Sequence, residues 1–165
     1  MARRILVTGG TGYIGSHTVV ELQNSGYEVI IIDNLSNSSA DVVDNIEKVS
    51  GIRPIFEELD CLDYNGLDAL FAKYKGIEAI IHFAASKAVG ESVQKPLLYY
   101  RNNLVSLINL LELMPKHNVG GIVFSSSCTV YGQPDELPVT ENAPIKKAES
   151  PYGNTKQINE EIVQD

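Results

Sequence analysis

The chain has 165 residues, of which 44% are hydrophobic and 21% charged, as in an ordinary globular domain. Its formal net charge is −8 and no basic run exceeds two residues, which argues against nucleic acid or an anionic membrane surface as a partner. The two cysteines, Cys61 and Cys128, lie far apart and indicate neither a disulfide framework nor a zinc site. No apolar segment approaches the roughly 20 residues of a membrane span, so we expect a soluble, cytoplasmic protein.

Three glycines follow the first predicted strand. Residues 3–7 are predicted to form a short strand that ends in three apolar residues. Gly9, Gly12 and Gly15 follow it, the last of them inside a helical pattern over residues 13–22. Glycine lets the backbone turn sharply, lets a pyrophosphate approach the amide N–H groups, and lets the helix pack close to the sheet. The helix N-terminus then faces the anion with unpaired N–H groups and its positive dipole end. The spacing therefore predicts a dinucleotide-binding loop.

A second predicted strand, residues 28–32, ends in Asp33. This acid lies 21 residues after Gly12, near the offset at which dinucleotide-binding folds place a carboxylate on the adenine ribose. A carboxylate accepts hydrogen bonds from the ribose hydroxyls and repels a 2′-phosphate, so Asp33 favours NAD over NADP. The alternative is an ordinary turn acid after a buried strand.

Strand and helix patterns alternate along the rest of the chain, which predicts a parallel sheet covered on both faces. The strands read as continuous apolar runs, as buried parallel strands should. After a polar loop at 34–39, we predict helix 40–49, strand 53–57, helix 65–74, strand 78–83, helix 93–114, strand 121–124, a loop at 132–149, and a helix from Pro151 capped by Ser150. Pro115 is expected to stop the long helix. The predicted fold is α/β, a Rossmann-type doubly wound parallel sheet, in one NAD-binding domain over residues 1–165.

Ligands of open α/β sheets bind outside the carboxyl ends of the strands. The candidate residues all follow predicted strand ends: residues 9–15, Asp33, Asp60, residues 82–87 and residues 125–127. Their shared location is stronger evidence than any one of them. We interpret His82 as a core or strand-end histidine rather than a catalytic base.

Tyr152 and Lys156 are four residues apart on the last predicted helix, so both side chains project from one face. A phenol, with an ordinary pKa of about 10, is a poor base at neutral pH, and a nearby ammonium favours its phenolate form. Ser127, at the end of the fifth strand, can share a hydrogen bond with a substrate oxygen. This trio predicts proton removal from an alcohol while NAD takes the hydride.

Several longer stretches carry a family resemblance. Residues 8–15 and 152–156 resemble the extended short-chain dehydrogenase/reductases. Within that superfamily, the chain resembles the UDP-glucose (UDP-galactose) 4-epimerases at residues 15–19, 33–38, 87–97, 125–132 and 150–153. Segments 87–97 and 125–132 are specific to the epimerases within that superfamily. Two departures stand out, since Ala85 and Ser86 replace the usual Gly-Leu and Cys128 replaces a usual alanine. We expect only slight adjustments near the nicotinamide from them.

The resemblance implies NAD as cofactor and UDP-glucose and UDP-galactose as substrates. It implies the reaction of galactose metabolism in which a hydride leaves C4, the 4-keto sugar rotates, and the hydride returns to the other face. It assigns catalysis to Ser127, Tyr152 and Lys156, sugar-nucleotide binding to Ser127 and Tyr152, and the adenine amino group to Asp60. It also implies homodimers that pair through helices 93–114 and 152 onward. The implied NAD-binding residues are Gly9, Gly12, Tyr13, Ile14, Gly15, Asp33, Asn34, Asn37, Ser38, Asp60, Cys61, Phe83, Ala84, Lys87, Asn102, Ser125, Tyr152 and Lys156.

Members of that family continue beyond this length with more sheet and a C-terminal substrate domain, and in some fungal members with a fused mutarotase domain. We therefore expect this chain to be the N-terminal part of such a protein, truncated before the substrate domain and inactive by itself. One alternative is a nucleotide-sugar 4,6-dehydratase, but that family places an Asp-Glu pair where Cys128 and Thr129 stand. The other is a non-catalytic NAD-binding module, which need not keep a tyrosine–lysine pair together with Ser127.

Overall fold

The computed structural model describes residues 3–165, which form two compact units. The first unit comprises the described residues up to Ala84 together with Leu107–Ser125, and the second comprises Ala85–Ser106 and Ser126–Asp165. The chain crosses from the second unit back to the first inside helix α5 (Pro96–Lys116), after Ser106.

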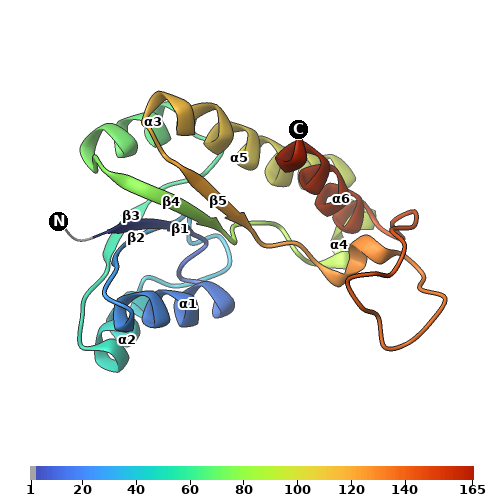
Figure 1. Cartoon of the computed structure of the whole chain (residues 1–165), viewed down its shortest axis with the longest axis horizontal. Helices are drawn as coiled ribbons and strands as arrows, with labels where there is room; N and C mark the ends of the chain where they lie inside the picture. Colours follow the sequence, from blue (N-terminus) through green and yellow to red (C-terminus); the bar gives the residue numbers. More distant parts are fainter. Residues whose placement is uncertain (1–2) are drawn as a thin grey trace. The chain divides into compact units, whose positions relative to one another are not determined.

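A five-stranded parallel sheet forms the centre of the first unit (Figure 1). In spatial order its strands are β3 (Ile55–Glu58), β2 (Glu28–Asp33), β1 (Arg4–Thr8), β4 (Ile77–His82) and β5 (Gly121–Phe124). Thr8, at the end of β1, pairs with Ile32 on one side and His82 on the other. The chain therefore winds outward in both directions from β1, and the carboxyl ends beside β1 and β4 form the switch point at which such sheets bind ligands. This is the predicted Rossmann-type order.

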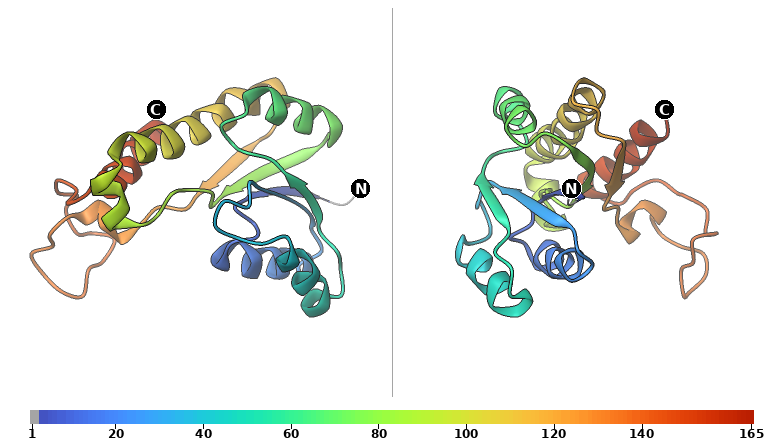
Figure 2. Two further views of the ribbon diagram at one scale, coloured as in Figure 1. Left: turned by 180° about the vertical axis from the view of Figure 1, so that it is seen from behind. Right: turned by 60° about the vertical axis from the view of Figure 1, so that its left-hand side comes forward.

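Helices of the first unit cover both faces of its sheet (Figure 2). α1 (Tyr13–Asn24) and α2 (Asp41–Ser50) cover one face, while α3 (Tyr64–Lys73) and the C-terminal half of α5 cover the other. Along β2, Val29 and Ile31 belong to the core under α1 and α2, and Ile30 and Ile32 belong to the opposite core. All four are at most 2% exposed, which explains the continuous apolar run in the sequence.

The two edge strands of this sheet differ in composition. β3 follows Pro54 and carries Glu57 and Glu58. β5 has no charged residue, and its Val123 side chain is 59% exposed. Within residues 3–165, β3 pairs only with β2, and β5 pairs only with β4.

The second unit contains α4 (Val89–Gln94), the N-terminal half of α5, the short 3₁₀ helix η1 (Cys128–Tyr131) and α6 (Pro151–Gln164). Both α4 and η1 contact α6. Ser150 caps α6 as predicted, because its Oγ accepts from the Gly153 N–H at 3.1 Å and Pro151 occupies the first turn. In the described part of the chain, no helix is both long and apolar enough to span a bilayer.

The prediction of one long helix over residues 93–114 is wrong at both ends. The chain breaks at Lys95 (φ −130°, ψ 58°), because a residue before proline avoids the helical conformation, and Pro96 then starts α5. Pro115 lies inside α5 instead of stopping it. It falls in the last turn, where its missing N–H removes a single bond, and the His117 N–H still reaches the Leu113 carbonyl at 3.1 Å. The strand predicted from residue 53 begins only at Ile55.

Candidate functional site

The glycine loop of the first unit leaves no room for side chains at two positions. Gly9 has φ +69°, and its N–H donates to the Ile32 carbonyl at 2.8 Å. A Cβ on Gly9 would lie 2.8 Å from the Ala84 nitrogen, and one on Gly15 would lie 2.2 Å from the Gly9 carbonyl oxygen. Both neighbours are backbone atoms, which cannot swing aside as a side chain can. The loop conformation and the close approach of α1 therefore require glycine at both positions.

Helix α1 begins directly after this loop, and its N-cap, Gly12, offers no side chain to the first-turn N–H groups. Tyr13 and Ile14 in that turn are 78% and 60% exposed. The turn contains no acidic residue that would compete for an anion. An exposed helix N-terminus of this kind, with N–H groups and the positive dipole end presented together, suits a phosphate.

Asp33 is 9% exposed at the end of β2, beside the glycine loop. Its Oδ2 accepts from the Thr11 N–H at 3.3 Å, and its Oδ1 accepts from the Leu35 N–H at 3.0 Å and from the Ser38 hydroxyl at 3.1 Å. A carboxylate has about four acceptor positions, so these three bonds leave one on Oδ2 for a ligand hydroxyl. The geometry fits a ribose while also fixing the loop that follows β2.

A second carboxylate lies near the end of β3. Asp60 accepts from the Asn34 amide at 3.0 Å through Oδ2 and from the Leu62 N–H at 2.8 Å through Oδ1. Cys61 next to it is buried, and burial raises the pKa of its thiol to about 12, so it stays protonated and serves as an apolar wall. The Asn109 amide, from α5, donates to the Cys61 carbonyl at 2.9 Å and holds this turn in place.

The end of β4 is tied to the end of β1. His82 is 2% exposed, and its Nδ1 lies 2.7 Å from the Thr8 Oγ1, which also accepts from the Ala84 N–H at 3.2 Å. The ring of His82 stacks against Phe124 of β5 at 6.2 Å between centroids. His82 is therefore a core histidine, as interpreted from the sequence, and Phe83 and Ala84 follow it toward the carboxyl edge.

A buried polar network organises the second unit around Asn103, which is 1% exposed. Its Nδ2 donates to the Ser86 carbonyl and to the Thr155 hydroxyl, both at 3.0 Å, and its Oδ1 accepts from the Ser86 N–H at 2.8 Å. Asn102 donates to the Ser86 hydroxyl at 3.1 Å. Lys87 and Asn102 are predicted site residues, whereas Asn103 and Thr155 have no spacing in the sequence that distinguishes them.

The three predicted catalytic side chains all belong to the second unit. Tyr152 and Lys156 lie one turn apart on α6, with the Lys156 Nζ 6.0 Å from the centroid of the Tyr152 ring. Ser127 is the N-cap of η1, and its Oγ accepts from the Thr129 N–H at 3.3 Å and the Thr129 hydroxyl at 3.0 Å. A serine oxygen that accepts these bonds keeps its own proton for another acceptor.

Lys156 is only 4% exposed. This burial lowers the pKa of its ammonium to about 8, while the Glu160 carboxylate, one turn further along α6, acts in the opposite direction. A lysine with this pKa holds a proton at neutral pH yet can release it at little cost.

Of the remaining predicted residues, some lie at the surface, and Ser125 takes part through its backbone. Asn37 is exposed in the loop after β2, and Lys87 is exposed before α4. The Ser125 N–H donates to the His82 carbonyl at 3.1 Å, which continues the pairing of β5 with β4. Contacts thus connect Ala84, the glycine loop, Asp33 and Asp60 within the first unit, and the asparagine network and α6 within the second.

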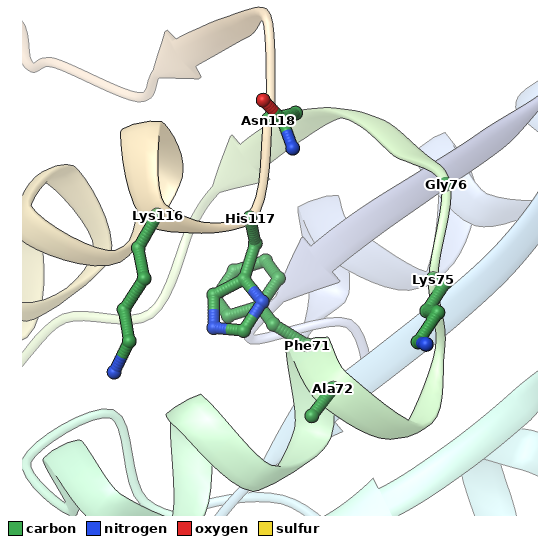
Figure 3. A pocket seen from close by; sticks show the side chains of 7 residues that line it. All are labelled: Phe71, Ala72, Lys75, Gly76, Lys116, His117 and Asn118. Carbon is green, nitrogen blue, oxygen red and sulfur yellow. The ribbon is translucent and has the colours of Figure 1, made fainter.

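A hollow of about 490 Å³ lies at the opposite edge of the first unit's sheet, beside Gly76, where β4 begins (Figure 3). The His117 ring stacks on Phe71 at 5.3 Å between centroids, and Asp68 of α3 contacts the His117 Nε2 at 2.6 Å and the Lys116 Nζ at 2.8 Å. These contacts fasten α3 to the end of α5. None of the residues that line the hollow is a predicted site residue. The lining consists of Phe71, Ala72, Lys75, Gly76, Lys116, His117 and Asn118. Among residues 3–165, no group of His, Cys, Asp and Glu side chains is placed to hold a metal ion.

Comparison with known proteins places this geometry among nucleotide-sugar enzymes. The model of the NAD dependent epimerase/dehydratase family matches residues 5–165. UDP-glucose 4-epimerase of Bacillus subtilis is 55% identical over 161 residues, which are 98% of this chain and 47% of that protein. The human UDP-glucose 4-epimerase is 50% identical over 171 residues, covering 100% of this chain and 49% of its own length.

Solved structures agree with the sequence relatives. The crystal structure of UDP-glucose 4-epimerase from Bifidobacterium longum, in complex with NAD⁺ and UDP, has a TM-score of 0.95 at 48% identity over 98% of this chain and 48% of that one. The enzyme from Stenotrophomonas maltophila, with bound NAD and formylated UDP-arabinopyranose, has a TM-score of 0.94 at 46% identity, covering 99% and 48%. The chain thus spans about half the length of the relatives it matches.

Proposed function

The chain belongs to the NAD-dependent epimerase/dehydratase family, and from this we propose that the complete gene product interconverts UDP-glucose and UDP-galactose. NAD is the cofactor of the family. The substrate assignment is supported by relatives that are themselves UDP-glucose 4-epimerases. It is also supported by the epimerase-like segments at residues 87–97 and 125–132. The reaction belongs to galactose metabolism, for which we expect a cytoplasmic location.

The pair formed by Tyr152 and Lys156 on α6 is the observation that carries the proposal. The Tyr152 oxygen takes the proton of the sugar 4-hydroxyl and later returns it, and the Lys156 ammonium stabilises the phenolate in between. The Ser127 hydroxyl donates a hydrogen bond to the same sugar oxygen. When bound, NAD would supply the redox chemistry, by accepting a hydride from C4 and giving it back to the other face of the 4-keto sugar.

Hydrogen bonds of Thr155 stabilise the turn of α6 that carries Tyr152. The Thr155 hydroxyl donates to the Tyr152 carbonyl at 2.7 Å and accepts from the buried Asn103 amide at 3.0 Å. Thr155 itself is fully buried. These bonds limit fraying of the first turn of α6 and so keep Tyr152 and Lys156 on a fixed face.

For the cofactor, we propose that the N-terminus of α1 after Gly12 binds the pyrophosphate and that Asp33 binds the adenine ribose. Asp60 would accept from the adenine amino group, and its bond from Asn34 leaves acceptor positions for this. The other proposed NAD-binding residues are Gly9, Tyr13, Ile14, Gly15, Asn34, Asn37, Ser38, Cys61, Phe83, Ala84, Lys87, Asn102, Ser125, Tyr152 and Lys156.

The residues of the site argue against the two alternative functions, a dehydratase and a non-catalytic NAD-binding module. Elimination of water by a dehydratase needs an acid and a base after the serine, and Cys128 and Thr129 of η1 supply neither. A non-catalytic NAD-binding module need not keep a tyrosine–lysine pair, whereas this chain has Tyr152 and Lys156 one turn apart on α6, together with Ser127.

We also propose that the protein forms homodimers through α5 and α6, and the exposed residues of α5 support this. Leu98 and Val105 are seven residues apart, and therefore on one face of the helix, and are 48% and 37% exposed. Leu97 beside them is 80% exposed. A second copy of the same helix is a natural cover for such an apolar strip.

A coupled assay on the complete gene product tests the function. With NAD present and UDP-galactose as substrate, we expect UDP-glucose to form and to be consumed by an added UDP-glucose dehydrogenase. Formation of a 4-keto-6-deoxy sugar would instead indicate the dehydratase. NAD binding without any turnover would indicate the module.

A further inference from the structure

The segment that carries Ser127 is tied to α6 at both of its ends. At its start, the Ser126 hydroxyl donates to the carboxylate of Glu160. At its end, the Gln157 Nε2 donates to the Val130 carbonyl at 2.7 Å. Ser127 lies between the two ties, and all of these residues belong to the second unit.

A third contact lies along the same line of α6. A Cβ on Gly153 would lie 3.2 Å from the Thr129 carbonyl oxygen and 3.3 Å from the Thr129 Cβ, so the helix approaches η1 closely at this point. Gly153, Gln157 and Glu160 are spaced by four and three residues and therefore form one face of α6. This face adjoins the line of Tyr152 and Lys156, each of which directly precedes a member of it.

We propose that Gln157 and Glu160 are positioning residues that hold the Ser127 hydroxyl in register with Tyr152 and Lys156. This inference rests on the proposed function. Because the ties come from the helix that carries the other two groups, any movement of α6 takes Ser127 with it. The distance between the serine and the tyrosine–lysine pair is then set by α6, which also holds the loop at 132–149, because the Gln157 Nε2 donates to the Lys146 carbonyl at 2.5 Å.

The hydrogen bonds from Gln157 and Glu160 are better suited to positioning Ser127 than to stabilising the fold. Ser126 is exposed and Glu160 and Gln157 are half-buried, so the two side chains bury little apolar surface. Exposed and half-buried polar contacts of this kind contribute little to folding. A displacement of about 1 Å in a reacting group can cost about a hundredfold in rate. Loss of a tie should therefore affect turnover more than unfolding.

Two substitutions in the complete gene product test the proposal, Gln157→Met and Glu160→Ala. Each is expected to lower kcat for UDP-galactose by about tenfold while KM changes by less than about twofold, since the serine makes only one of the contacts that bind the substrate, whereas its register acts directly on the reacting oxygen. Glu160→Gln, which keeps an acceptor oxygen, should retain most of the activity. Gln164→Met and Glu161→Ala are the matched controls, because both residues are exposed on α6, and they should leave kcat unchanged.

A second comparison separates positioning from a general loosening of the protein. In a Ser127→Ala background, Gln157→Met should lower kcat no further, because the group that it positions is gone. Glu160→Ala is left out of this comparison, because the Glu160 carboxylate also raises the pKa of Lys156. An equal loss with and without the serine hydroxyl would overturn the proposal, as would unchanged kcat in both single variants.

Hydrogen exchange of the NAD-free protein supplies a measurement that is independent of turnover. The amides of residues 126–131 should exchange faster in Gln157→Met and Glu160→Ala than in the parent, and at the parent rate in the two controls. Unchanged exchange rates would mean that Gln157 and Glu160 do not hold residues 126–131 in place. Absence of turnover in the parent protein would overturn the proposed function, and the ties would then be judged on exchange alone.

Discussion

The ammonium nitrogen of Lys156 lies 6.0 Å from the centroid of the Tyr152 ring, one turn further along α6. Because Lys156 is 4% exposed, little water lies near enough to screen its charge. The positive charge therefore faces the electron-rich ring of Tyr152 with little screening, as in a cation–π contact. The same burial has a cost in stability, since the ammonium has given up its hydration.

Removing only the phenolic oxygen tests the proton-transfer role. Tyr152→Phe in the complete gene product is expected to lower turnover of UDP-galactose by about a hundredfold or more, because general acid–base groups contribute on this scale. NAD should remain bound, since the ring and the helix are kept. Turnover and NAD content are measured on the same preparation. Near-normal turnover would remove Tyr152 from the role of base.

The buried lysine makes stability depend on pH. Its pKa falls from 10.5 to about 8 on folding. Below about pH 8 the ammonium is charged in both the folded and unfolded chains, and its burial then lowers the free energy of unfolding by about 3 kcal/mol. Between those two pKa values the unfolded chain binds more protons than the folded chain, so this cost shrinks as the pH rises.

Lys156→Met removes the ammonium and keeps the length of the side chain. In the NAD-free protein, we expect its gain in free energy of unfolding over the parent to be largest near about pH 7 and to fall to less than half by about pH 9.5. Urea unfolding of both proteins across this range measures the difference. A difference that stays constant with pH would mean that the pKa of Lys156 is not lowered by folding.

Cofactor choice depends on Asp33. The parent should bind NAD much more tightly than NADP, and Asp33→Asn should narrow the ratio of the two dissociation constants by about tenfold or more by removing repulsion of the 2′-phosphate. Asparagine keeps an oxygen for the bonds from Leu35 and Ser38, so the loop after β2 should persist. Asp60→Asn serves as the control and should not change the ratio. Equal affinity of the parent for both cofactors would rule out a ribose contact by Asp33.

The 165-residue chain by itself is expected not to convert UDP-galactose. It spans about half the length of its curated relatives, and the groups that would bind the uridine diphosphate are not among the residues assigned to the site. Holding the sugar in a reactive geometry can supply several kcal/mol of the barrier, so both rate and affinity should suffer. The coupled assay on the purified chain measures this, and turnover comparable to that of the complete gene product would contradict it.

The fold could be predicted because strands buried on both faces leave a plain record in the sequence. Residues 29–32 form an unbroken apolar run, and all four positions are at most 2% exposed on alternating faces. The positions of Asp33 and of the glycine loop followed from that run and from known spacing. The cap at Ser150 was predictable for the same reason, because it depends on residues within one turn.

Contacts between distant residues could not be predicted. Ser126 and Glu160 are 34 positions apart, and no periodicity in either segment connects them. Asn103 likewise meets Thr155 only in the folded unit. The break at Lys95 did have a local signal in Pro96, but the apolar repeat after it outweighed that signal in the sequence interpretation.

The unequal edges of the sheet have a consequence for how the chain behaves in solution. An unpaired strand edge is a template for another chain, and proteins guard such edges with charges and proline. β3 is guarded by Pro54, Glu57 and Glu58, whereas β5 presents a short uncharged strand with an exposed Val123. Self-association of the 165-residue chain is therefore expected to begin at β5, and Val123→Lys should raise the concentration at which it precipitates.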